Sequence, residues 1–331
     1  MEQQEHQQLS PVHDKREYLF DNYKVLLIVL VVIGHFIEPS YDQNPFLYEL
    51  KWGIVAFHMP AFIFISGYFS KRIPSFKKLV QGLVIPYFVY EIIYYLLYTL
   101  ILDKDTGLYF TRPKFSLWYL MALFVWRILG PFVRKIPGHM ALSLTLGLLI
   151  GLIDPDNFLS IPRIVFFFPF FLAGLDFDSS CLTRFRNRKG YLTALGILGA
   201  FAVFLFTDSL HDQLSPKIFY GRYSYESLGM DNVEGFIVRI FCYAISFLLI
   251  YLFMLVLPAE KKSWSYLGER TMAIYIFHGF IYSYLKYGSS ILSSVESNLE
   301  SILLVCFCLF LVWLLSRKPF VSVTNKIAHL I

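Results

Sequence analysis

Residues 21–38, DNYKVLLIVLVVIGHFIE, form an apolar segment with a cation near its start and a histidine near its end. Eleven residues of an α-helix rise about 16.5 Å and make close to three turns, so Lys24 and His35 are predicted to share one helix face. Glu38 follows three residues after the histidine. This face is either a catalytic axis or part of an ordinary packing surface.

Apolar segments of this kind recur along the chain. Of the 331 residues, 56% are hydrophobic and 16% are charged, against roughly 25% charged in an average soluble domain. The segments are about 17 to 22 residues long, enough to cross a hydrocarbon layer about 30 Å thick as helices. We therefore expect an all-α, polytopic integral membrane protein of about ten transmembrane helices, at 23–38, 53–70, 83–102, 116–133, 140–153, 161–175, 191–207, 236–257, 271–287 and 301–316.

The basic residues predict the orientation in the membrane. With the N-terminus inside, nineteen basic residues fall on the cytoplasmic side and nine on the opposite side, as the positive-inside rule requires. We expect a multi-pass protein of the cell membrane with a cytosolic N-terminal segment (1–22), one transmembrane domain (23–316) and a cytosolic C-terminal tail (317–331).

Other features narrow the function classes. The first twenty residues are polar, so no cleavable signal peptide is expected. The four cysteines have neither metal-ligand nor disulfide spacing, and no metal is predicted. No Walker loop or dinucleotide fingerprint is present, and nucleic acid is not an expected partner.

Ionisable residues in several predicted spans point to a shared cavity. His35, His58, Glu91 and His278 each lie in a different apolar segment. A single buried histidine is most simply a packed residue bonded to a neighbour. Charged and titratable groups at membrane depth are costly, however, and they usually face an interior cavity. Four such residues in different spans therefore favour a cavity, with His58, Glu91 and His278 as substrate-binding candidates.

Two groups of cations are candidates for binding anions. The loop after the second span carries Lys71, Arg72, Lys77 and Lys78, which suit either nucleotide phosphates or anionic lipid head groups. Arg163 begins the sixth span at its outer end, against the charge bias, where it requires a carboxylate partner, an anionic ligand or snorkelling to the interface. The outer loop 208–235 is rich in Tyr, Gly and Ser and is either a wall of a sugar site or an ordinary loop.

Five segments together resemble the membrane acyltransferase-3 family, and within it the branch similar to fucose 4-O-acetylase. The first span matches the family's motif of a basic residue, a ten-residue gap and a histidine, on Lys24 and His35. The others are FHMPAFIFISGYF, WYLMALFVWR, FFPFFLAG and LGERTMAIYIFHGF. One element departs from the family pattern, because Gln81 replaces the second cation of a basic motif that begins at Lys78.

The resemblance implies an O-acyltransferase, most simply an O-acetyltransferase, of cell-envelope polysaccharide. An acyl group would pass from cytosolic acetyl-CoA, or another acyl-CoA, to a hydroxyl of a glycan or lipid-linked sugar. His35 would be the base and Lys24 its basic partner, with Glu38 orienting the ring or the sugar. Lys71, Arg72, Lys77 and Lys78 would hold the donor phosphates, and Arg163 would join His58, Glu91 and His278 at the acceptor.

A transporter or flippase for a glycan intermediate is the main alternative, because it also needs polar groups around an intramembrane cavity. It would not require Lys24 and His35 on one line, and the sequence shows no internal repeat of the kind that many transporters have. A membrane scaffold without catalytic activity is a third possibility, which the buried ionisable groups disfavour.

Overall fold

The computed structural model describes residues 17–72, 75–154, 157–207 and 214–329. The described part is helical, without a strand. Residues 1–16, 208–213 and 330–331 of the expected terminal segments and outer loop lie outside it. Its α-helices are α1 (Tyr18–Phe36), α2 (Pro45–Val55), α3 (His58–Tyr68), α4 (Phe76–Leu79), α5 (Ile85–Leu96), α6 (Trp118–Val133), α7 (His139–Leu149), α8 (Ile161–Asp176), α9 (Cys181–Phe185), α10 (Arg188–Leu205), α11 (Asn232–Val256), α12 (Thr271–Gly288), α13 (Asn298–Leu315) and α14 (Lys318–Ala328).

Among the described residues, seven helical segments are long and apolar enough to cross a membrane, in agreement with a multi-pass membrane protein. They are Tyr18–Phe36, Pro45–Tyr68, Phe76–Ile101, Phe158–Asp176, Arg188–Leu205, Asn232–Val256 and Asn298–Leu315. Trp118–Val133 and His139–Leu152 are apolar but shorter. Each of the ten expected spans overlaps a helix, and α12 is outside the seven although it is also 18 residues long. The count of about ten and the orientation stay predictions.

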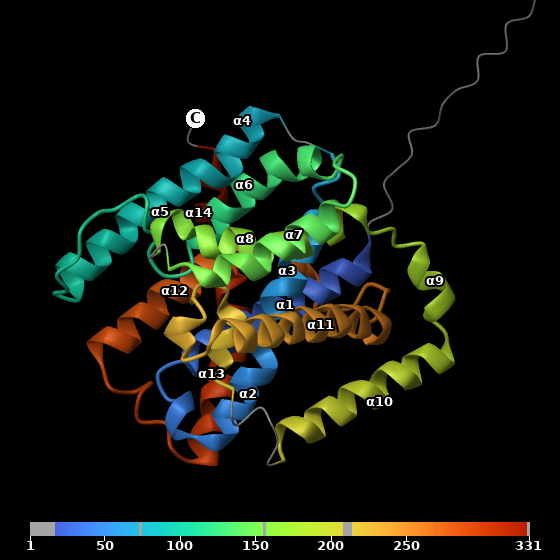
Figure 1. Cartoon of the computed structure of the whole chain (residues 1–331). Coiled ribbons are helices and arrows are strands. Elements are labelled where there is room, and N and C mark those ends of the chain that lie inside the picture. Colours follow the sequence, from blue (N-terminus) through green and yellow to red (C-terminus); the bar gives the residue numbers. More distant parts are fainter. Residues whose placement is uncertain (1–16, 73–74, 155–156, 208–213, 330–331) are drawn as a thin grey trace, which may run out of the picture.

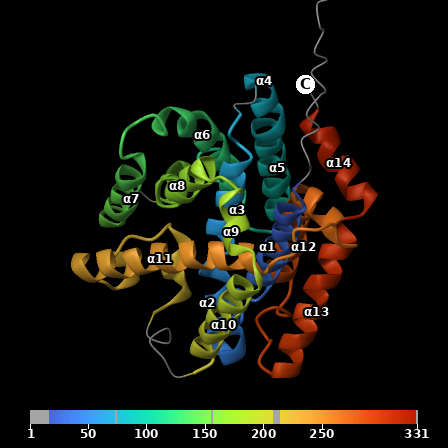
Figure 2. The same cartoon turned by 90° about the vertical axis from the view of Figure 1, so that its right-hand side faces the viewer.

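Helix α1 lies inside the bundle, where α3, α12 and α13 pack around it (Figures 1 and 2). Tyr23 and Leu27 belong to the larger hydrophobic core, which includes α3, α8 and α11. Ile28 and Val32 belong to a second core that α12 and α13 complete. Because apolar residues cover most of its circumference, α1 is buried on more than one side.

One end of the bundle carries Lys24, Lys71, Arg134, Arg186 and Arg270, and we call it the basic end. There the Tyr68 hydroxyl donates to Glu17 at 2.9 Å, and the Asn22 amide donates to the Pro258 carbonyl at 2.8 Å. Arg270 donates to the Ser316 carbonyl at 2.9 Å. These bonds tie the starts of α1 and α12 to the ends of α3, α11 and α13. The opposite end holds the ends of α1 and α12, the start of α2 and a short 3-10 turn at Pro216–Tyr220.

The second expected span, 53–70, is a longer segment with a break. Phe57 has φ −144° and ψ −19°, which separates α2 from α3. The break leaves the Ile54 carbonyl available, and the ring Nδ1 of His58 bonds to it at 2.8 Å. The break therefore fixes the histidine at the start of α3, in the middle of the bundle.

Helices α3 and α8 cross at two glycines. A Cβ atom at Gly67 would overlap the Phe171 carbonyl, and one at Gly174 would overlap the Phe64 carbonyl. Small residues at such a crossing let two membrane helices approach closely. Because α8 also carries Arg163, this crossing sets the position of one wall of the cavity described below.

Gly174→Ala is expected to lower the free energy of unfolding by about 1–3 kcal/mol, because the added methyl group must push two backbones apart. The measurement is the midpoint of thermal unfolding of the purified protein in detergent. Gly196→Ala is the matched control, since nothing lies within 4 Å of a Cβ atom at that helical glycine. A midpoint for Gly174→Ala equal to that of the control would contradict the close crossing.

Candidate active site

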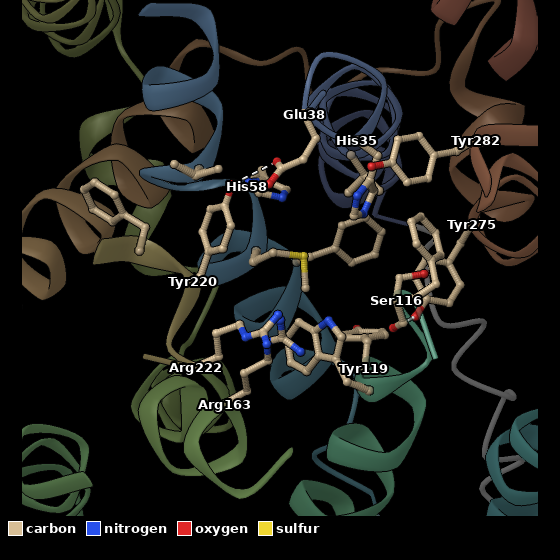
Figure 3. Close-up of a pocket in the computed structure, with 18 of the residues that line it drawn as sticks. His35, Glu38, His58, Ser116, Tyr119, Arg163, Tyr220, Arg222, Tyr275 and Tyr282 are labelled. Atoms are coloured by element: carbon tan, nitrogen blue, oxygen red, sulfur yellow. Dashed lines mark hydrogen bonds between the residues drawn. The ribbon is translucent and has the colours of Figure 1, made fainter. Parts of the chain in front are cut away.

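A cavity of about 580 Å³ lies between α1, α2, α3, α6, α8 and α12 (Figure 3). This volume is in the range of small-molecule sites in proteins. The cavity extends from Lys24 and Thr271, toward the basic end, to Arg222 and Tyr287, toward the opposite end. Of the residues singled out in the sequence, it brings together Lys24, His35, Glu38, His58 and Arg163.

His35 projects from the last turn of α1 into this cavity (Figure 3). Its ring packs against Phe115, with centroids 4.6 Å apart, and against His278 at 5.4 Å and Tyr282 at 5.9 Å. Within the described ranges no hydrogen bond joins the His35 ring to another residue. The imidazole is therefore held by aromatic packing, and its polar edge is left for a ligand.

Phe115 owes its position to a buried ion pair behind it. The Lys114 backbone N–H and Nζ each donate to the Glu91 carboxylate at 3.0 Å, and Glu91 is completely buried. Phe115 has φ +48°, a conformation that costs a non-glycine residue about 1–2 kcal/mol. The pair of Glu91 and Lys114 thus fixes the strained residue whose ring supports His35.

Glu91 was expected to face the cavity as a substrate-binding residue, and the structure places it elsewhere. It is outside the residues that line the cavity, and both of its oxygens bond to Lys114. A carboxylate buried in a helical bundle needs a cation, and the sequence gives no sign that Lys114, 23 residues away, supplies it. The residue supports the cavity wall from behind.

The other two histidines have one ring nitrogen fixed. Nδ1 of His58 bonds to the Ile54 carbonyl, and Nδ1 of His278 bonds to the Ile274 carbonyl at 2.9 Å. A carbonyl only accepts, so both rings carry the proton on Nδ1 and have a free acceptor at Nε2. His58 lines the cavity, whereas His278 is completely buried behind His35, and its Nε2 has no partner among the described residues.

Glu38 does not orient the His35 ring. Its carboxylate forms an ion pair with Lys51 of α2, and it accepts a hydrogen bond from the Tyr220 hydroxyl at 2.9 Å. Lys51 also donates to the Gly34 carbonyl at 2.6 Å. Lys51 is only 4% exposed, so it closes the end of α1 and holds the carboxylate at the rim of the cavity.

Tyr220 brings residues 216–223, which belong to the predicted outer loop and which we call the outer segment, to this carboxylate. Burial, and then the negative charge of Glu38, raise the pKa of the Tyr220 phenol above its usual range. The phenol therefore keeps its proton over the physiological pH range and remains the donor. Through this bond the segment at 216–223 is attached to the end of α1.

Lys24 lines the cavity toward the basic end, and His35 lines it too, in agreement with the shared helix face that their spacing predicted. Its ammonium pairs with Asp21 at 2.9 Å and lies 5.5 Å from the centre of the Phe69 ring. Its distance in sequence from His35 places the two at different depths of one cavity. They are not in direct contact.

The cations of the loop after α3 are outside the cavity. Lys71 donates to the Phe177 carbonyl and lies 4.2 Å from the centre of the Tyr68 ring. Arg72, Lys77 and Lys78 are exposed at the basic end. Residues 73–74 between them are outside the described ranges. The arrangement is compatible with both a surface anchor and a phosphate site.

Four residues that shape the site were not singled out from the sequence: Lys51, Phe115, Tyr220 and Arg222. Lys51 was counted only as a basic residue of the outer side. Tyr220 and Arg222 lie in the predicted outer loop, which was a candidate wall of a sugar site. The Tyr-, Gly- and Ser-rich sequence SPKIFYGRYSY was the available signal for them.

Among the described residues no group of three His, Cys, Asp or Glu side chains could hold a metal ion.

A family model described as an acyltransferase domain matches residues 17–317. The match runs from the residue before α1 to the residue before α14 and includes every residue that lines the cavity. No curated protein and no solved structure matches the chain.

Proposed function

Because the chain belongs to the acyltransferase-3 family and is a membrane acyltransferase, we propose that it transfers an acetyl group from cytosolic acetyl-CoA to a hydroxyl of a cell-surface glycan or its lipid-linked precursor. The fucose 4-O-acetylase branch is our proposal for its place in the family. The observation that carries the proposal is the His35 imidazole, which faces the cavity with no hydrogen bond to a described residue and is fixed by aromatic rings.

His35 acts as the general base. It accepts the proton of the acceptor hydroxyl as the hydroxyl oxygen attacks the thioester carbonyl. The C–S bond then breaks, and His35 returns the proton to the sulfur, so that coenzyme A leaves as the thiol and the ring is neutral again. A neutral imidazole suits this step because one ring nitrogen is free to accept. Phe115, His278 and Tyr282 keep the ring in place, so little reorganisation is needed when the acceptor arrives.

The donor and the acceptor approach from different ends. Lys71, Arg72, Lys77 and Lys78 hold the coenzyme A phosphates at the basic end, which we take as cytoplasmic. The pantetheine arm then passes Lys24 to bring the thioester near His35. The acceptor enters from the opposite end, between Glu38, Tyr220 and Arg163. Glu38 receives the Tyr220 hydrogen bond there and is available to a sugar hydroxyl.

Membranes that contain the chain, supplied with labelled acetyl-CoA, are expected to transfer label to surface glycan. Membranes without the chain are the control. Movement of unmodified glycan without any transfer of label would contradict the proposal and would favour a carrier. Analysis of O-acyl groups in surface polysaccharide, with and without the protein, identifies the acceptor sugar.

A further inference from the structure

The cavity carries more positive than negative side chains. Its cations are Lys24, Lys51, Arg163, Arg222 and Lys286, and its one carboxylate is Glu38. Lys24 pairs with Asp21, and Lys51 pairs with Glu38. Across the described ranges no carboxylate forms an ion pair with any of the remaining three cations. Positive charge therefore faces the cavity without a counter-ion from the described part of the chain.

Arg163 is held in the first turn of α8. Its guanidinium lies over the Trp118 ring, 4.9 Å from the ring centre, an arrangement that favours arginine over lysine. The next carbonyl, of Ile164, accepts the indole N–H of Trp126 at 2.9 Å. Both contacts come from α6, so the side chain is fixed before any ligand binds.

Arg222 sits between two anchored residues of the outer segment. Gly221 has φ +64°, and a Cβ atom there would overlap the Phe166 ring of α8. The Tyr223 carbonyl accepts a hydrogen bond at 3.1 Å from Arg239, which is almost completely buried. The backbone on both sides of Arg222 is thus fixed against α8 and α11, the first of which also carries Arg163.

The two guanidinium groups lie together on the side of the cavity across from His35 and Glu38 (Figure 3). They are close enough for their charges to interact. Two like charges in a partly dry cavity repel each other, and the repulsion is removed when an anion binds between them. Paired guanidinium forks match the oxygen spacing of carboxylates and phosphates.

We propose that Arg163 and Arg222 form a binding site for an acidic group of the acceptor, a carboxylate or a phosphate on the sugar. This inference rests on the proposed acyl transfer and specifies its substrate class as an anionic sugar. With the acid held by the two arginines, a hydroxyl on the other side of the sugar ring faces His35. The arginine pair then binds acidic sugars in preference to neutral ones. The position of the acidic group on the sugar ring determines which hydroxyl is acylated.

The acceptor is a better source of this anion than the donor. The long pantetheine arm separates the phosphates of coenzyme A from its thioester, whereas Arg163 and His35 line the same 580 Å³ cavity. Arg222 belongs to the outer segment at the end opposite the exposed cations of the 71–78 loop. Donor phosphates at the arginine pair would place the thioester away from the base.

Binding of three sugars with one common ring tests this proposal: glucose, glucuronate and glucose 1-phosphate. Dissociation constants are measured on the purified full chain in nanodiscs. At least one anionic sugar is expected to bind tenfold or more tightly than glucose, since hydrogen bonds between charged groups are among the strong ones. Arg163→Gln and Arg222→Gln are each expected to remove the preference, so that the anionic sugars bind no more tightly than glucose does.

Lys217→Gln is the matched control, because it removes a positive charge from the same outer segment at a side chain that does not line the cavity. It is expected to retain the preference for the anionic sugar. Equal binding of all three sugars by the unmodified chain, or a preference that survives Arg163→Gln and Arg222→Gln together, would overturn the site.

Measuring the dissociation constant of coenzyme A for the same variants shows whether the anion at the arginine pair comes from the donor or from the acceptor. If the arginine variants weaken coenzyme A and leave the anionic sugars unchanged, the site belongs to the donor and the assignment to the acceptor is wrong. These binding measurements do not depend on turnover. A chain that binds anionic sugars through the arginine pair but transfers no label from acetyl-CoA would refute the proposed function and leave the site intact.

Discussion

His35→Ala is expected to reduce kcat for acyl transfer by about 10²- to 10⁴-fold, the range that a positioned general base contributes. The ring makes no hydrogen bond to a described residue, so its removal should leave the fold and the level of protein in the membrane unchanged. The assay is transfer of label from acetyl-CoA to glycan, measured with the purified variant at saturating donor.

The control for this variant is His139→Ala. His139 is outside the cavity and bonds to Asp176 at the surface of the basic end, so its loss should leave kcat near that of the unmodified chain. Full activity of His35→Ala would show that His35 is not the general base. His58, whose Nδ1 is bonded and whose Nε2 can accept a proton, would then be the next candidate.

Lys114→Met is expected to lower the free energy of unfolding by about 3–5 kcal/mol, because it leaves the buried Glu91 carboxylate without its counter-ion. Glu91 is 0% exposed and receives both bonds from Lys114, so no water replaces the lost ammonium easily. The midpoint of thermal unfolding in detergent measures the effect.

The matched variant is the double substitution Glu91→Gln with Lys114→Met. Removing the negative charge together with the positive one avoids the uncompensated carboxylate, so the double variant should be more stable than Lys114→Met alone. A double variant that is less stable than Lys114→Met would show that the carboxylate is not the source of the cost. Both variants should also lower kcat, since Phe115, which supports His35, follows directly after Lys114.

The helical periodicity of one segment predicted the central part of the site. Lys24 and His35 were placed on one face from their spacing alone, and both line the cavity. The chain's membership of the acyltransferase-3 family, which the resemblance of five segments had indicated, is confirmed by the match over residues 17–317. The spacing of residues within one apolar segment carries this information, because a helix converts a separation in sequence into a direction.

The partners of the charged residues could not be predicted in this way. Glu38 was expected to orient the His35 ring or the sugar. Its bonds go to Lys51 and Tyr220, the latter 182 residues away, and only the second role stays a prediction. Glu91 was grouped with the histidines, although its partner Lys114 lies in the loop before α6, next to Phe115 with its positive φ. Ion pairs between distant segments depend on how helices pack against one another, and helical periodicity does not predict that packing.

Helix α10 stands at the edge of the bundle, with Ala194 and Leu205 as its buried residues (Figure 1). Its 18 residues span about 27 Å, slightly less than the roughly 30 Å of an average hydrocarbon layer. Packing on α11 sets its tilt, but most of its surface lies outside the bundle, so its apolar length must match the surrounding lipid. The thickness of the host membrane is therefore a structural variable for this helix, while the helices around the cavity are held by one another.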